Sequence, residues 1–236
     1  MGHVLDRKGS VAQQVRRRVL RSDERLWRIE DFEGSPSAVN NELRRLISRG
    51  ELVRVRRGVY WRGKKSRFGM IGASQGEAVQ KLFGAQEAIG ATGWHATNLL
   101  GLSTQVSPVE ALAVTHRRPD GLHNVKISSR AARSGRREAK LNGMEVTFLE
   151  ALEGWDRYVE ADGATALERF GELLDREDVR VERLVRASRT EPPVVRERLR
   201  AVLRHGGYEE QAERVPAARD PRTRARALRV LGGTAA

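Results

Sequence analysis

The feature that most constrains this chain is a strongly signalled helix followed at once by a hairpin. Ser35 and the proline after it are typical of a helix start, and Gly50 can end that helix. Residues 52–56 then alternate apolar and polar side chains, Arg57-Gly58 forms a turn, and residues 59–61 resume a strand, which predicts a hairpin of two short strands. One stripe of the helix is apolar and should pack inward: Val39, Leu43, Leu46 and Ile47.

The opposite face of this predicted helix carries side chains suited to reading DNA bases. Arginine can bond guanine and asparagine can bond adenine through paired hydrogen bonds, so these residue types on an outer helix face indicate contact with base edges. The same pattern also fits an ordinary solvated helix. The candidate base-reading residues are Ser37, Asn40, Asn41, Arg44 and Arg45.

The hairpin and the residues after it are rich in cations, as expected of a wing that holds phosphates beside a recognition helix. An earlier helix capped by Ser10 and a short apolar element at 24–32 complete the pattern. We therefore predict a winged helix-turn-helix that binds double-stranded DNA over residues 1–69, its last part, 62–69, being a linker. The candidate phosphate contacts are Arg54, Arg56, Arg57, Arg62, Lys64 and Lys65.

The distribution of charge supports a separate basic module. The whole chain carries a net charge of +13, and residues 1–69 contribute 18 basic against 8 acidic side chains. Residues 70–160 are neutral, with ten of each sign, so the excess is mainly an N-terminal property. A basic domain of this kind favours a polyanionic partner, with nucleic acid ahead of an acidic membrane surface.

The remainder of the chain predicts a mixed α/β domain over 70–215 with a mainly helical end, which makes the whole an α+β protein. We expect helices at 77–90, capped by Ser74, and at 94–100, 164–175, 179–187 and 194–203. We expect strands at 109–115, 125–128 and 144–149. For the basic segment 216–236 two interpretations are open, a disordered tail or a second phosphate contact.

The motifs of common enzymes are missing, so we expect no catalytic site, metal or cofactor. The chain has no cysteine, which excludes disulfides and thiol chemistry. Its five histidines show no metal-ligand spacing. The Gly-x-Ser-x-Gly match at 72–76 follows a basic segment rather than a buried strand, and helix capping explains its serine more simply. No stretch is long and apolar enough to span a membrane, and the start lacks the apolar run of a signal peptide, so we expect a soluble, cytoplasmic protein.

Three segments together resemble the AbiEi antitoxin family of abortive-infection toxin-antitoxin systems. They are the basic hairpin ending Arg-Gly-Val-Tyr-Trp at 57–61, the run Trp-His-Ala-Thr-Asn-Leu-Leu-Gly-Leu at 94–102 that continues to 106, and the strand carrying Val114-Thr115. The resemblance covers about residues 10–160. It implies an N-terminal winged helix-turn-helix that represses its own operon at promoter inverted repeats. It also implies a second domain that counteracts a nucleotidyltransferase-like toxin encoded beside it.

Two other interpretations remain open at this stage. One is a one-component transcription regulator whose second domain senses a small ligand. The other is a nucleic-acid enzyme that uses the N-terminal domain only for docking. The 94–106 segment is itself apolar around residues 99–102, which favours a role in the core of the second domain.

Overall fold

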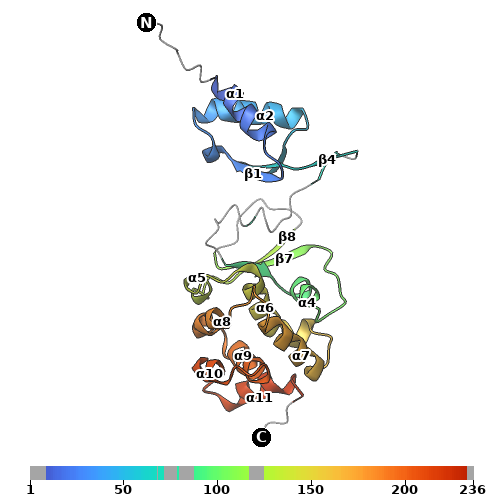
Figure 1. The fold of residues 1–236 in the computed structure, drawn as a ribbon, viewed down its shortest axis with the longest axis vertical. Helices are drawn as coiled ribbons and strands as arrows, with labels where there is room; N and C mark the ends of the chain where they lie inside the picture. Colours follow the sequence, from blue (N-terminus) through green and yellow to red (C-terminus); the bar gives the residue numbers. More distant parts are fainter. Residues whose placement is uncertain (1–8, 68, 72–78, 80–87, 117–124, 233–236) are drawn as a thin grey trace. The chain divides into compact units, whose positions relative to one another are not determined.

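The computed structural model describes residues 9–67, 69–71, 79, 88–116 and 125–232 (Figure 1). The chain forms two compact units, residues 1–82 with 120–123 and residues 83–119 with 124–236. The division falls at residue 82, whereas the sequence placed it after residue 69. Helices and small sheets occur in both units, which agrees with the predicted α+β class. None of the helices in the described ranges is both long and apolar enough to cross a membrane.

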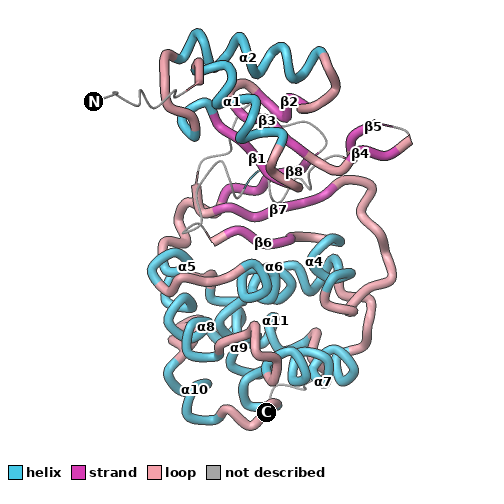
Figure 2. The backbone as a smooth tube through the Cα atoms, turned by 45° about the horizontal axis from the view of Figure 1, so that its top comes forward, coloured by secondary structure: helices cyan, strands magenta, loops and turns pink. Residues whose placement is uncertain are grey.

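The first unit places two helices against a three-stranded sheet (Figure 2). Ser10 caps α1 and Ser35 caps α2, as predicted, since each serine oxygen accepts a backbone N–H of the first turn. The strands are antiparallel in the order β1-β3-β2, so β3 lies in the middle. The elements are α1 (Val11–Leu20), β1 (Arg25–Arg28), the 3-10 helix η1 (Ile29–Asp31), α2 (Pro36–Ser48), β2 (Val53–Arg56) and β3 (Val59–Arg62).

The core of the first unit lies between the two helices and the sheet. The predicted apolar stripe of α2 is confirmed, because Val39, Leu43 and Leu46 are buried and Ile47 packs partly buried beside them. From α1 come Val15 and Val19, and from the sheet side come Trp27 and Tyr60. Trp27 stacks on Phe32 with ring centroids 5.0 Å apart.

The predicted linker at 62–69 is wrong. Arg62 ends β3, and the next residues form a small antiparallel pair, β4 (Lys65–Ser66) and β5 (Gly69–Met70). The returning segment is held by the Trp61 indole N–H, which donates to the carbonyl of Ile71 at 2.7 Å, and by the backbone bond from Ile71 N–H to the carbonyl of Lys64 at 2.9 Å. Met70 also packs on a buried cluster of Leu26, Val59 and Trp61. A Gly- and Lys-containing segment therefore acquires strand structure from its apolar neighbours.

The second unit is built from one small sheet and a group of helices. The sheet order is β6-β7-β8, with β6 antiparallel to β7 and β7 parallel to β8. Its elements in the described ranges are β6 (Ile89–Ala91), α4 (Trp94–Leu99), β7 (Glu110–Val114), β8 (Val125–Ser129), α5 (Gly135–Glu138), α6 (Gly143–Tyr158), α7 (Gly163–Leu174), α8 (Val181–Ala187), η2 (Ser188–Thr190), α9 (Pro193–His205), α10 (Glu209–Arg214) and α11 (Pro221–Arg229).

Most predicted elements of the second unit are confirmed. The strands at 109–115 and 125–128 and the helices at 94–100, 164–175, 179–187 and 194–203 all match observed elements to within a few residues. The helix predicted at 77–90 lies mostly outside the described residues, as do Ser74 and the Gly-x-Ser-x-Gly match at 72–76. Its last two residues, 89–90, belong instead to strand β6.

The predicted strand at 144–149 is wrong, because these residues begin the central helix α6. Asn142 caps this helix, and Glu145 completes a capping box with it. Residues 146–149 are all buried, so α6 has no solvated face there to reveal helical periodicity. Strand β6 lies directly against α6: a Cβ added at Gly90 would stand 2.6 Å from the carbonyl oxygen of Gly143.

The basic segment 216–236 is not a disordered tail over its described part. Asp220 caps helix α11, accepting the backbone N–H groups of Arg222 and Thr223. Ala227 and Leu231 are buried, and Leu231 belongs to the main core of the second unit. The arginines that suggested a disordered tail lie on the exposed side of α11. The few buried apolar side chains that hold this helix were not evident in a segment with so many arginines.

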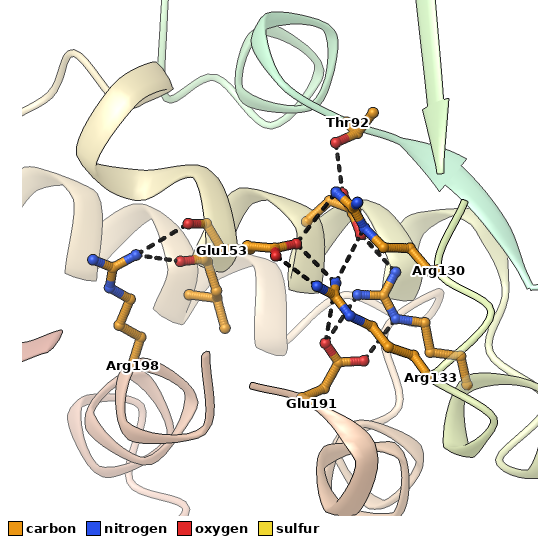
Figure 3. A network of polar contacts seen from close by, with 9 residues as sticks. Thr92, Arg130, Arg133, Glu153, Glu191 and Arg198 are labelled. Carbon is orange, nitrogen blue, oxygen red and sulfur yellow. Dashed lines mark hydrogen bonds and ion pairs between the residues drawn. The ribbon is translucent and has the colours of Figure 1, made fainter. Parts of the chain in front are cut away.

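A buried network of arginines and glutamates holds α5, α6 and the segment after η2 together (Figure 3). Arg136 is fully buried and donates to Glu150 at 2.7 Å and to both carboxylate oxygens of Glu191 at 2.7 and 2.9 Å. Arg130 donates to both oxygens of Glu150 at 2.9 and 2.7 Å. Arg133 adds contacts to Glu150, Glu153 and Glu191.

The charge of Glu150 is sustained by its neighbours. Burial by itself would raise the pKa of Glu150, but the hydrogen bonds from Arg130 and the charge of Arg136 hold this pKa at about 2. The Thr92 hydroxyl donates to the same carboxylate at 2.6 Å. Because the ordinary value is 4.5, the ionised carboxylate stabilises the folded state above about pH 4.5, and this contribution is lost as pH falls toward 2.

We expect Glu150→Gln to destabilise the second unit by about 3 to 5 kcal/mol at pH 7, because it leaves buried guanidinium groups without their counter-charge. The wild-type chain should lose stability as pH falls from 4.5 to 3, and the variant should lose much less. Hydrogen exchange of the α6 amides would measure both effects. The control is Glu172→Gln, which removes an exposed i,i+3 pair and should change little. Equal acid sensitivity of wild type and E150Q would contradict the assignment.

Candidate nucleic-acid interface

The outer face of α2 presents the predicted base-reading side chains. Ser37, Asn41, Arg44 and Arg45 are exposed, and Asn40 is half-buried. Among the described residues, the side chains of Asn41 and Arg44 make no hydrogen bond or ion pair, so their polar groups are available to an incoming ligand. The structure thus brings these residues together on one helix face, as the periodicity required.

Two of the predicted residues also have contacts within the unit. The Tyr60 hydroxyl donates to the Asn40 side-chain carbonyl at 3.4 Å, which connects α2 to the central strand of the sheet. Arg45 makes an ion pair with Glu42 at 3.4 Å while its side chain stays 64% exposed. Asn40 keeps its amide donors and Arg45 keeps most of its guanidinium accessible, so both contacts orient the side chains without covering them.

The residue that sequence reasoning missed on this helix is Glu42. It is fully buried, and it accepts a hydrogen bond from Arg16 of α1 at 2.7 Å. Burial would raise the pKa of Glu42, but the hydrogen bonds and charges of Arg16 and Arg45 together lower this pKa below its ordinary value. The signal was present in the sequence: Glu42 lies three residues after Val39 and directly before Leu43, inside the apolar stripe. A carboxylate at such a position needs a cation from a neighbouring element.

The β2–β3 hairpin carries two cations that are exposed and unengaged. Arg54 and Arg57 lie in solvent and contact no partner within the described part of the chain. Arg56 is half-buried and takes part in another interaction. The pairing with β3 is irregular between Arg54 and Arg56, and Gly58 forms the turn with a φ of +79°, which suits glycine.

The other three predicted phosphate contacts are neutralised within the unit. Arg62 pairs with Glu51 at 2.8 Å and is only 16% exposed. Lys65 also pairs with Glu51, and Lys64 pairs with Glu24 at 3.3 Å. Their role in DNA contact stays a prediction, and their carboxylate partners make them weaker candidates than Arg54 and Arg57. Further exposed cations that the prediction left out are Arg17, Arg21 and Arg49.

The histidines and carboxylates of the described ranges bear on a possible metal site. No group of three His, Asp or Glu side chains there could hold a metal ion. His95 bonds through Nδ1 to the backbone of Ala111, which gives that histidine a structural role. In the first unit, exposed polar and cationic side chains lie on the outer face of α2 and on the β2–β3 hairpin.

Comparison with known proteins places the chain in a family without giving an activity. Residues 19–139 match the model of a family of unknown function, DUF6088, and the chain belongs to that family. It is also similar to the crystal structure of the RV2827C protein from Mycobacterium tuberculosis, with 19% identity and a TM-score of 0.44 over 87% of this chain and 78% of that one. No curated protein matches this chain. A function must therefore be argued from the geometry.

Proposed function

We propose that the first unit is a winged helix-turn-helix that binds duplex DNA. The order of its elements supports this proposal: α1, β1, η1 and α2 are followed directly by the β2–β3 hairpin. In this proposal η1 takes the place of the first helix of the helix-turn-helix pair, α2 is the recognition helix, and the hairpin is the wing. The sheet order β1-β3-β2 places the hairpin beside the strand that precedes η1.

The observation that carries the proposal is the pair Asn41 and Arg44 on the outer face of α2. Both are exposed, and neither has a partner among the described residues. The helix beneath them is fixed by three buried apolar side chains and by buried Glu42, so their backbone is rigid. Arginine and asparagine on a rigid helix can each form two hydrogen bonds to a base edge in the major groove.

The hairpin supplies the sequence-independent part of the proposed contact. In this proposal Arg54 and Arg57, which are exposed, contact phosphates while α2 lies in the groove. Phosphate contacts fix the orientation of a protein on the duplex and make its affinity depend on salt. The positive charge of residues 1–69 would also accelerate encounter with DNA.

We further propose that the chain represses its own operon at promoter inverted repeats and counteracts a nucleotidyltransferase-like toxin encoded beside it. This part rests on the resemblance of the segments at 57–61, 94–106 and 114–115 to the AbiEi antitoxins. The 94–106 segment contributes Leu100 and Leu102 to the core, while Leu99 and Val106 are 55% and 80% exposed. The second candidate is a one-component regulator that senses a small ligand, which a cavity in the second unit favours.

We expect Arg44→Ala or Asn41→Ala to weaken binding to the operator by about 1 to 3 kcal/mol and to relax discrimination at one base position. Binding to random DNA should fall much less. Titration of labelled operator, of single-base variants and of random duplex measures the difference. Arg189→Ala, which removes one exposed charge from the second unit, is the matched control. Equal losses on operator and random DNA would show that α2 does not read bases.

Replacing Arg54 and Arg57 together by alanine should have a different signature. Operator and random DNA should both bind more weakly, and the slope of log affinity against log salt should decrease by about 1 to 2, since each lost phosphate contact releases fewer counterions. The same titrations repeated over a range of salt concentrations provide the slope. Arg137 and Arg189 changed together to alanine match the loss of charge. An unchanged slope would contradict the wing assignment.

Co-expression with the product of the adjacent gene tests the antitoxin part. We expect the wild-type chain to rescue growth, and Arg44→Ala to rescue it equally, because toxin antagonism is assigned to the second unit. Co-purification of the two proteins would indicate direct contact, and rescue without co-purification would indicate indirect antagonism. Absence of rescue would leave the operator-binding proposal standing and remove the antitoxin one.

A further inference from the structure

The second unit contains a cavity of about 360 Å³ that the proposed DNA interface does not use. Its walls come from β7, β8, the segment leading into α4, and the C-terminal half of α6. A volume of this size lies within the range of small-molecule sites in proteins. The side chains used in the argument are Trp94, Lys126, Ser128, Arg157 and Tyr158, with Glu150 and Glu153 at the wall.

The carboxylate of Glu150 is fully engaged, and both oxygens of Glu153 already have an arginine partner. Glu150 accepts from Arg130, Arg133, Arg136 and Thr92. Both oxygens of Glu153 accept from Arg133, and one of them also lies 3.3 Å from Arg130. Figure 3 marks the hydrogen bonds and ion pairs of this network with dashed lines. Their negative charge is therefore balanced inside the network, and a ligand in the cavity would not meet an unpaired anion.

Four other side chains at the cavity wall can donate hydrogen bonds, and two of them are charged. Lys126 projects from β8 and Arg157 from α6, and both are exposed. Ser128 lies two residues after Lys126 on β8, and the Trp94 indole adds an N–H group. None of these side-chain donors has a hydrogen bond or ion pair with another described residue. The guanidinium of Arg157 lies 5.5 Å from the ring of Tyr158, which leaves its N–H groups available.

An aromatic pair completes the cavity. Trp94 and Tyr158 meet edge to face with ring centroids 5.2 Å apart and an interplanar angle of 74°. Aromatic side chains at the wall of a small-molecule site favour a flat, apolar part of the ligand. Cations and donors beside them favour a carboxylate or phosphate.

From these groups we propose that the cavity binds a small organic anion that carries a planar ring. Lys126 and Arg157 hold the anionic group, with Ser128 as a neutral donor, and Trp94 and Tyr158 contact the ring. The inference goes beyond operator binding and does not depend on it, because the cavity lies entirely in the second unit. It assigns a ligand class to a surface that the family match leaves without a function.

Calorimetric titration of the full chain without DNA tests the proposal. The probes are adenosine and guanosine monophosphate and salicylate, which combine a ring with an anion. Adenosine supplies a ring without charge, and inorganic phosphate supplies charge without a ring. At about 0.15 M salt we expect at least one of the three ring-bearing anions to bind the chain. Inorganic phosphate should bind about tenfold more weakly than that anion or not at all, and adenosine should not bind.

Variants decide whether binding occurs in this cavity. Lys126→Gln and Arg157→Gln should each weaken binding about tenfold or more, because each removes a charge-assisted hydrogen bond. Both side chains are exposed, so the variants should fold, which the circular dichroism spectrum checks. Arg189→Gln removes the same charge away from the cavity and should bind as the wild type does. The proposal fails if none of the three ring-bearing anions binds, if phosphate binds as tightly as they do, or if the cavity variants bind like Arg189→Gln.

Discussion

Burial of the Glu150 carboxylate is the constraint on which the second unit depends. A charge removed from water must be paired and hydrogen-bonded. One cation cannot occupy all the hydrogen-bond acceptor positions of a carboxylate, so a buried carboxylate needs several donors. Arg130, Arg133 and Arg136 fulfil this requirement, and Glu191 balances Arg136 on its other side. The chain segments after β8, in α5 and after η2 are thereby fixed against α6. Because of this pairing, the charged side chains of the adjoining cavity that keep no ionic partner among the described residues are the cations Lys126 and Arg157.

The first unit applies the same rule on a smaller scale. Glu42 lies under the outer face of α2 and accepts from Arg16 of α1, so the buried side of α2 is joined to α1 by charge as well as by apolar contact. The helix can therefore keep Asn41 and Arg44 in solvent without losing its position. Sites that recognise a ligand need such rigid support, since the geometry of paired hydrogen bonds tolerates little displacement.

Local signals were sufficient for the elements that combine a cap with a periodic apolar stripe. Helices α1 and α2 were predicted with their serine caps, and the hairpin with its Arg57-Gly58 turn, because these features involve residues close in sequence. Prediction failed where burial conceals periodicity or where distant residues supply the order. Residues 145–149 of α6 are all buried, and the short strands Lys65–Ser66 and Gly69–Met70 form where Met70 packs against Trp61.

The sequence by itself determined the α+β class and the basic N-terminal module. It also indicated which face of one helix is a candidate DNA interface. Charge, spacing and capping are properties of neighbouring residues, so they can be read without a fold. Only the tertiary structure decided which cations stay available. Glu51 neutralises Arg62 and Lys65, and Glu24 neutralises Lys64, whereas Arg54 and Arg57 remain exposed. An ion pair depends on distance in space, and residues far apart in sequence, such as Lys64 and Glu24, meet only once the chain has folded.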